Sequence, residues 1–289
     1  GVPPERIFFT PYAVNNDFFQ NQYKKFIGKK KILKKELNLN PKLPVILYSA
    51  KLIERKRPFD LLRAFKMLQK EFGDKAQLLF VGDGPERNKL ENYARESKIT
   101  DVKFFGFKKQ NELPKFFAAA DIFIQPSAIE IWGLATNEAM NFALPVITTS
   151  MSGTAYDIVQ HNKNGFVYQP GNHEELKFSL QKLILDEKLR KKMGFESLKI
   201  IKNWSYGKAT EGIVAALKSI ARPKVIVANP GSHHLWRTAV ALQNANLLKF
   251  YITTIYPRAK KFPYTYLQIM PNKWKLKFLN QLKKRFHQE

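Results

Sequence analysis

The chain has 289 residues, 44% of them hydrophobic, and 49 Lys and Arg against 24 Asp and Glu give a formal net charge of +25. This length allows one or two domains with a sizeable core, and the absence of Cys excludes disulfides, thiolate metal sites and a Cys nucleophile. No run of 18 apolar residues and no basic-then-apolar N-terminus occurs, so neither a transmembrane helix nor a secretory signal is expected. The positive field favours anionic partners such as nucleotide phosphates, acidic lipid headgroups or nucleic acid.

Strand and helix patterns alternate along the chain, as a doubly wound parallel sheet requires. Five parallel strands are expected at 45–49, 77–81, 102–105, 122–125 and 146–149. The helices between them are expected at 60–71, 86–97, 112–119 and 137–143. A short helix at 153–161, a strand at 165–168 and closing helices at 173–187 and 196–202 should complete this α/β, Rossmann-like domain.

A second pattern of the same kind begins after Arg222. An apolar strand from Pro223 to Asn229 runs into a polar, glycine-bearing loop, and a helix at 237–248 and a strand at 250–255 follow. This order predicts a partial βαβ unit, because the residues from 223 to 289 are too few for a full Rossmann domain.

Two carboxylates flank a glycine turn in the middle of the chain. Glu130 follows the predicted strand 122–125, and Glu138 lies in the first turns of the next predicted helix, with Gly133 between them. The free N–H groups of a helix N-terminus attract phosphate, and ligands of open α/β sheets bind at the carboxyl ends of the strands. This layout suits a sugar nucleotide.

Several motifs occur together in a characteristic order. Glu130 and Glu138, followed by Asn-Phe-Ala-Leu-Pro-Val-Ile at 141–147 and Asn-Gly-Phe-Val at 164–167, resemble the retaining glycosyltransferases of family 4, which have the GT-B architecture. Further similar segments lie at 1–15, 45–56, 80–85 and 102–107, so the resemblance covers about residues 1–215.

The resemblance implies a domain organisation in which the sheet is the C-terminal half of a GT-B fold. Residues 1–18 would be the crossover from a preceding domain that this chain lacks, and 19–222 the domain that binds the donor sugar nucleotide. Residues 223–289 would open the N-terminal Rossmann domain of a second glycosyltransferase and carry a basic tail. This order would arise if the chain is a segment of a tandem protein, with the nucleotide domain of one transferase followed by the opening of a second, or if it is a circular permutation.

The resemblance also assigns roles to individual residues. Lys51 and Lys56 would hold the donor diphosphate, although Lys51 replaces the usual Arg and lacks its planar fork. Glu138 would accept hydrogen bonds from the ribose hydroxyls, and Glu130, the candidate catalytic residue, would contact hydroxyls of the transferred sugar. A solvated loop acid and a helix N-terminal acid are the structural alternatives for these two residues.

The remaining candidates would act through the backbone. The N–H groups of Trp132, Gly133 and Leu134 would bind phosphate or sugar oxygens, while the Trp132 side chain is expected to pack rather than to stack on a ligand. Gly106 and Phe107 would meet the nucleotide base.

Gly82 and Gly84 are read as a tight turn. Ala143 stands where the family commonly has Gly, and Ser152 with Gly153 where it often has two glycines.

The implied reaction transfers a hexosyl unit from a nucleoside diphosphate sugar to an acceptor hydroxyl with retention, in polysaccharide or glycolipid synthesis. No cofactor and no metal are expected, because the five histidines have no ligand spacing. The acceptor would be a sugar or lipid-linked molecule, and the protein is expected in the cytoplasm, peripherally at the inner face of the membrane. The alternative is a catalytically incomplete nucleotide-binding or assembly module.

The charge clusters support two further hypotheses. Residues 258–285 contain nine basic residues and no acidic one, and Trp274, Phe278 and Leu282 recur at helical spacing between lysines. This pattern can lie on an anionic membrane, or its apolar residues can pack on the chain itself. Nucleic-acid binding is suggested by charge alone and is not expected, because no motif accompanies it.

Overall fold

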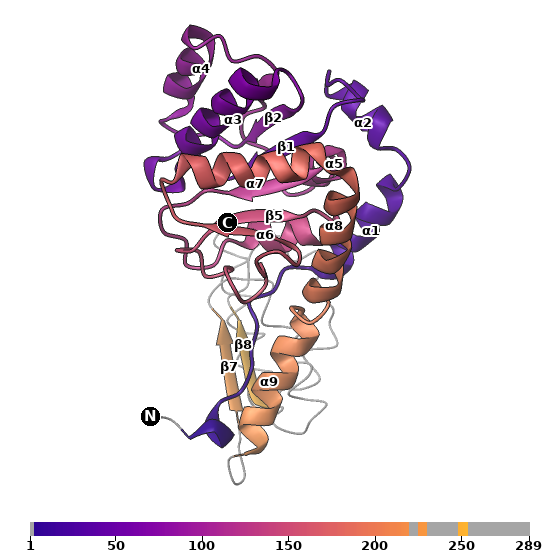
Figure 1. Ribbon diagram of the computed structural model, residues 1–289. Coiled ribbons are helices and arrows are strands. Elements are labelled where there is room, and N and C mark those ends of the chain that lie inside the picture. The colour runs from indigo at the N-terminus through magenta and orange to yellow at the C-terminus, as the bar shows by residue number, and fades with distance from the viewer. Residues whose placement is uncertain (1–2, 220–224, 230–247, 254–289) are drawn as a thin grey trace, which may run out of the picture. The chain divides into compact units, whose positions relative to one another are not determined.

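The computed structural model of the protein describes residues 3–219, 225–229 and 248–253 (Figure 1). The chain divides into two compact units, Pro11–Tyr206 and a second one of Gly1–Thr10 with Gly207–Glu289. Of the predicted helix 237–248 only Leu248 is described, as the start of a strand, and the basic tail 258–285 lies outside the described residues.

A parallel sheet of six strands forms the centre of the unit Pro11–Tyr206. The strands are β1 (Val45–Ser49), β2 (Gln77–Val81), β3 (Val102–Phe104), β4 (Ile122–Gln125), β5 (Val146–Thr149) and β6 (Gly165–Tyr168). Their spatial order is β3-β2-β1-β4-β5-β6, and every neighbouring pair is parallel. The doubly wound parallel sheet predicted from the sequence is therefore confirmed, including its additional strand at 165–168.

Each face of the sheet has its own core, because alternate strand residues point to opposite faces. In β1, Val45 and Leu47 belong to one core, and Ile46 and Tyr48 belong to the other. Helices with apolar stripes cover both faces, and each fully buried Leu or Phe contributes roughly 1.5–3 kcal/mol. The loops at the strand ends therefore stand on a rigid base.

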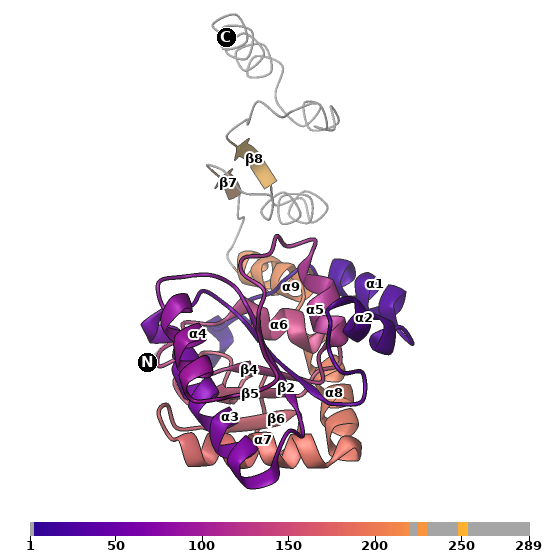
Figure 2. The same cartoon turned by 90° about the horizontal axis from the view of Figure 1, so that it is seen from above.

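The helices on the first face are α1 (Asn16–Phe26), α2 (Lys30–Glu36), α5 (Leu113–Ala119) and α6 (Leu134–Met140). Those on the second face are α3 (Pro58–Phe72), α4 (Arg87–Glu96) and α7 (His173–Leu185). Figure 2 shows α5 and α6 on one side of the strands and α3 and α7 on the other. None of the described helices is both long enough and apolar enough to cross a membrane.

Some helix bounds differ from those expected. α6 begins at Leu134 instead of residue 137, and α8 (Glu187–Ile201) is much longer than the predicted 196–202. Gly194 lies inside α8, and a Cβ there would come within 2.0 Å of the Ala143 carbonyl oxygen, so the glycine allows helix and loop to approach. The sequence patterns also missed α1, α2 and α9 (Tyr206–Lys218).

The helix predicted at 153–161 is wrong. These residues form turns closed by isolated bridges between Ala155 and Val159 and between His161 and Gly165. A Cβ on Gly153 would lie 1.9 Å from the Ile131 carbonyl oxygen, so close backbone packing fixes this segment. Its apolar and turn residues were mistaken for a helical pattern.

The second unit contains a short 3-10 helix η1 (Pro4–Arg6), nearly all of α9 and two strands, β7 (Val225–Asn229) and β8 (Leu248–Thr253). β7 and β8 pair in parallel, as the predicted βαβ unit requires. A Cβ on Gly212 of α9 would lie 1.9 Å from the Phe9 carbonyl oxygen, so the segment before Thr10 packs closely on this helix.

Candidate functional site

The carboxyl ends of all six strands lie at one edge of the sheet, because the strands are parallel. The chain order reverses between β1 and β4, which are neighbours. The loops that leave these two strands therefore diverge, and open α/β sheets bind ligands at such a switch point. Lys51 and Lys56 follow β1, and Glu130 follows β4, so three predicted site residues belong to this point of the sheet.

Lys56 and Glu130 come together although they belong to different loops. Lys56 ends a short 3-10 helix, η2 (Glu54–Lys56), and its ammonium forms an ion pair with the Glu130 carboxylate. Both side chains are largely buried, at 13% and 11% exposure. A hydrogen bond of 2.8 Å from the Ala128 N–H to the Arg55 carbonyl oxygen joins the two loops. Burial, followed by the charge of Arg55, lowers the pKa of Lys56 to about 8.

Glu130 is held by both its backbone and its side chain. Its N–H donates to the Met151 carbonyl oxygen at 3.1 Å, and its own carbonyl oxygen accepts from the Gly153 N–H at 2.8 Å. Besides Lys56, the carboxylate accepts from Gln125 Nε2 at 3.5 Å and Ser127 Oγ at 3.4 Å. This set of contacts is inconsistent with a merely solvated loop acid.

Gln125 is a site residue that the sequence patterns did not single out. It is the last residue of β4 and is buried, and its Oε1 accepts from Thr136 Oγ1 of α6 at 2.9 Å. Gly133 precedes α6 with φ 90°, and a Cβ there would lie 2.2 Å from Gln125 Nε2. The glycine thus allows α6 to start directly against Gln125, and one amide contacts both Glu130 and the helix.

The start of α6 offers free N–H groups. Within residues 3–219, the N–H groups of Trp132, Gly133 and Leu134 donate no hydrogen bond. Glu138 is the fifth residue of α6 and makes no side-chain hydrogen bond or ion pair within the same range. Burial raises the pKa of Glu138 to about 7. Glu138 is half-buried, so its carboxyl, which has no hydrogen-bond partner within residues 3–219, can still accept from donors that a ligand supplies.

The Trp132 side chain packs inside the protein, as expected. Its ring stacks between Tyr12 and Trp204, with centroids 5.5 Å and 4.9 Å away, and its Nε1 donates to Asn137 Oδ1 at 2.8 Å. Asn137 Nδ2 donates in turn to the Tyr12 carbonyl oxygen at 3.0 Å. Only the backbone of Trp132 is therefore available to a ligand.

The other candidate site residues lie at different distances from the switch point between β1 and β4. Lys51 is exposed directly after β1. A Cβ on Gly82 or Gly84 would lie 1.9 Å or 2.3 Å from the carbonyl oxygens of the loop after β1, which explains both glycines structurally. Gly106, with φ 67°, accepts from the Gly82 N–H at 2.9 Å, and Phe107 is 72% exposed. These two residues follow β3, which lies two strands away from β1.

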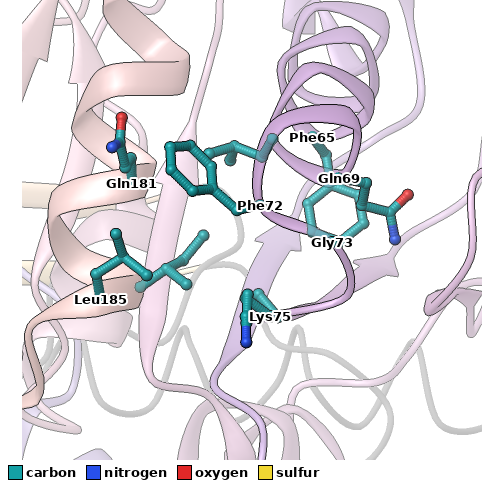
Figure 3. Close-up of a pocket in the computed structure, with 10 residues that line it drawn as sticks. Phe65, Gln69, Phe72, Gly73, Lys75, Gln181 and Leu185 are labelled. Carbon is teal, nitrogen blue, oxygen red and sulfur yellow. The ribbon is translucent and has the colours of Figure 1, made fainter.

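A small pocket elsewhere in the unit is not a candidate for a nucleotide. It lies between the end of α3 and α7, where Phe72 reaches toward Gln181 and Leu185 (Figure 3). Gly73 and Lys75 line it just before β2, so it is at the amino ends of the strands. Its free volume of about 10 Å³ holds at most one water molecule.

The six-stranded parallel sheet with helices on both faces defines a Rossmann-like α/β domain. The family model described as "Glycosyl transferases group 1" matches residues 29–199, more than half of the chain. The chain belongs to this glycosyltransferase family, whose GT-B fold its structural neighbours share.

Among curated relatives, N-acetyl-alpha-D-glucosaminyl L-malate synthase of Bacillus anthracis is 30% identical over 56% of this chain and 42% of its own length. The solved structure of HepE from Anabaena in complex with UDP matches with a TM-score of 0.62 at 23% identity, over 72% of this chain and 56% of that one. The C-terminal domain of a group 1 glycosyl transferase, LpcC of Francisella tularensis, matches with a TM-score of 0.55 at 21% identity, over 70% of this chain and 97% of that one. The chain spans only 33% to 42% of the length of the first curated relatives it matches.

Proposed function

We propose that residues 19–222 are the donor-binding domain of a retaining hexosyltransferase that uses a nucleoside diphosphate sugar. The observation that carries the proposal is the meeting of Lys56 and Glu130 at the switch point of the sheet, next to the free N–H groups before α6. HepE structures contain UDP, UDP with glucose, or UDP-glucose, which supports a ligand of this class.

The proposed roles follow from charge and hydrogen-bonding capacity. Lys56 and Lys51 neutralise the diphosphate, and the N–H groups of Trp132, Gly133 and Leu134 bind its oxygens or those of the sugar. Glu138 accepts from the ribose hydroxyls. Glu130 accepts from hydroxyls of the transferred sugar. Backbone groups of Gly106 and Phe107 read the edge of the base.

In the proposed reaction the bond between the anomeric carbon and the diphosphate breaks, the acceptor oxygen bonds to that carbon on the same face, and the proton of the acceptor hydroxyl passes to the leaving diphosphate. Negative charge develops on the leaving diphosphate, where Lys51 and Lys56 stabilise it. No metal is needed in this scheme. Metal independence remains a prediction.

The broader role is proposed from the names of relatives. They include a capsular polysaccharide glycosyltransferase of Staphylococcus aureus and a phosphatidylinositol monomannoside mannosyltransferase of Mycobacterium tuberculosis. We propose an acceptor that is a sugar or a lipid-linked sugar, and a place at the inner face of a membrane. The alternative is a catalytically incomplete nucleotide-binding or assembly module. Binding of a sugar nucleotide without turnover would support this alternative.

Two conservative variants test the division of labour between the carboxylates. Glu138→Gln should weaken the binding of the nucleoside diphosphate and of the sugar nucleotide equally, by about 1.5–3 kcal/mol, because both ligands carry the ribose. Glu130→Gln should weaken the binding of the sugar nucleotide only. The nucleoside diphosphate lacks the sugar, and Lys56, no longer paired with a carboxylate at position 130, can interact with its phosphates. Calorimetry with both ligands measures the difference, and Glu54→Gln, an exposed acid of η2, is the control. Equal losses for both ligands in both variants would contradict these roles.

A further inference from the structure

The outward side of α1 and α2 is unusual in its charge. Residues 18–35 contain seven lysines and no Asp or Glu. Five of these lysines are exposed, and two isoleucines between them are 58% and 57% exposed. We call these residues the α1–α2 surface: Lys24, Lys25, Ile27, Lys29, Lys31, Ile32 and Lys35.

Internal contacts fix which side of α2 faces outward. Lys30, Leu33, Lys34 and Leu37 recur at helical spacing and face the domain. The ammonium groups of Lys30 and Lys34 contact the Asp121 carboxylate, whose side chain is 16% exposed, at 2.9 Å and 2.7 Å. Leu33 and Leu37 pack in the core. The opposite side of the same turns, with two lysines and Ile32, must therefore point away from the protein.

α1 is fixed in the same way. Phe19 is fully buried, and Tyr23 and Phe26 pack against the same core at successive helical turns. Lys24 and Lys25 lie on the remaining side, in the last turn of the helix. Figures 1 and 2 both show α1 next to α2 at one flank of the sheet, so the two outward sides adjoin.

Within the described residues, the five lysines of the α1–α2 surface lack the acidic partners that several other helical lysines have. Lys89 pairs with Glu86, Lys191 with Glu187 and Lys199 with Glu196, each three or four residues away. The five lysines of this surface form no ion pair with the part of the chain that the structure describes. Their ammonium groups are thus unpaired within the described residues, and the side chains of the two isoleucines remain more than half exposed.

We propose that the α1–α2 surface docks on an anionic phospholipid bilayer, with the lysines at the headgroups and Ile27 and Ile32 inserted at the boundary of the acyl chains. Charge complementarity selects the occupant, and the exposed isoleucines favour lipid over nucleic acid, which offers no apolar layer for them. The surface deepens the proposed location at a membrane. It does not depend on donor binding, so calorimetry with sugar nucleotides is unaffected by its failure.

Cosedimentation of the full chain with phosphatidylglycerol-containing and pure phosphatidylcholine vesicles tests the proposal. The pair Ile27→Ser with Ile32→Ser should weaken binding to anionic vesicles at least about tenfold. The control pair Leu185→Ser with Phe195→Ser removes two apolar side chains of nearly equal exposure, 56% and 57%, and should leave binding unchanged. Equal binding by the two pairs, or equal binding to both kinds of vesicle, would overturn the proposal.

Charge is tested separately at equal net charge. Lys→Gln changes at Lys24, Lys25, Lys31 and Lys35 should weaken anionic vesicle binding by roughly fivefold per lysine at low salt. Four exposed lysines elsewhere in the same unit, Lys70, Lys75, Lys188 and Lys192, provide the matched control. If duplex DNA binding falls with the surface lysines while the isoleucine pair leaves vesicle binding intact, the partner is nucleic acid and the proposal fails.

A site-specific readout separates this surface from the basic tail. The chain has no Cys, so Ile32→Cys gives a single position for an environment-sensitive dye. Its emission should shift to the blue with anionic vesicles, whereas a dye introduced through Phe195→Cys should not respond. An unshifted dye at position 32 on vesicle-bound protein would show that another segment makes the contact.

Discussion

The pKa of Lys56 is lowered and that of Glu138 is raised, and both shifts oppose the charges that the proposed sugar-nucleotide site would require. Lys56 binds phosphate only as an ammonium, so affinity should fall as pH rises above about 8. In its proposed role Glu138 can accept from two ribose hydroxyls only as a carboxylate, so affinity should fall as pH drops below about 7. The affinity should therefore be greatest between these two values.

This pH dependence is measurable by calorimetry with a sugar nucleotide, whose two phosphates are both esterified and so do not titrate near pH 6. Lys56→Arg should extend binding to higher pH, because guanidinium stays charged. Glu138→Gln should reduce the fall in affinity below about pH 7. A profile that these two variants leave unchanged would show that other groups control it.

Ala143 is one of the positions at which this sequence departs from the family pattern, which commonly has Gly there. It has a left-handed φ of 55°, a conformation that costs an L-residue roughly 1–2 kcal/mol and suits glycine. Ala143→Gly should stabilise the protein by about 0.5–1 kcal/mol after the entropic cost of glycine. Urea unfolding measures the change. Ala94→Gly inside α4 is the control and should destabilise by about as much.

At the residue scale, the sequence predicted which residues belong to the strand ends but not what they contact. Spacing placed Glu130 after a strand, yet its ion pair with Lys56 joins loops far apart in the chain, and no local pattern records such a contact. Gln125 was missed for the same reason. It looks like an ordinary strand residue until the start of α6 is placed against it.

Among the elements, α6 depends most on one glycine. Gly133→Ala should destabilise the protein by more than about 1 kcal/mol and weaken donor binding, because a Cβ would displace the Gln125 amide that contacts Glu130. Gly28→Ala is a matched control, with φ 78° but no atom within 4 Å of its Cβ. Unfolding and calorimetry on both variants separate backbone strain from the lost contact. Equal effects on donor binding would contradict the role of Gln125.

The strands could be predicted from the sequence because each is a short apolar run bounded by turn residues, and all six are confirmed. Helices were harder. α2 reads as a run of lysines, and only its ion pairs with Asp121 and its packed leucines make it an element of the domain. The segment 153–161 looks helical but is held by backbone contacts of Gly153 instead.

For the whole molecule, the order of strands places every residue that is predicted to contact the donor at one edge of one sheet. The net charge of +25 adds a long-range attraction for anionic ligands, which salt screens. In the proposed function, donor binding uses this edge of the sheet. Donor binding can therefore be measured without following turnover.

Isothermal titration calorimetry of the full chain with UDP, GDP and ADP tests donor binding most directly. At least one of the three should bind below millimolar concentration, and Lys56→Ala should weaken it by about tenfold or more, through loss of a charge-assisted contact. Lys70→Ala, an exposed lysine of α3, should leave the affinity unchanged. No binding of any of the three at millimolar concentration to folded protein, or equal losses in both variants, would contradict a nucleotide site at the carboxyl ends of β1 and β4.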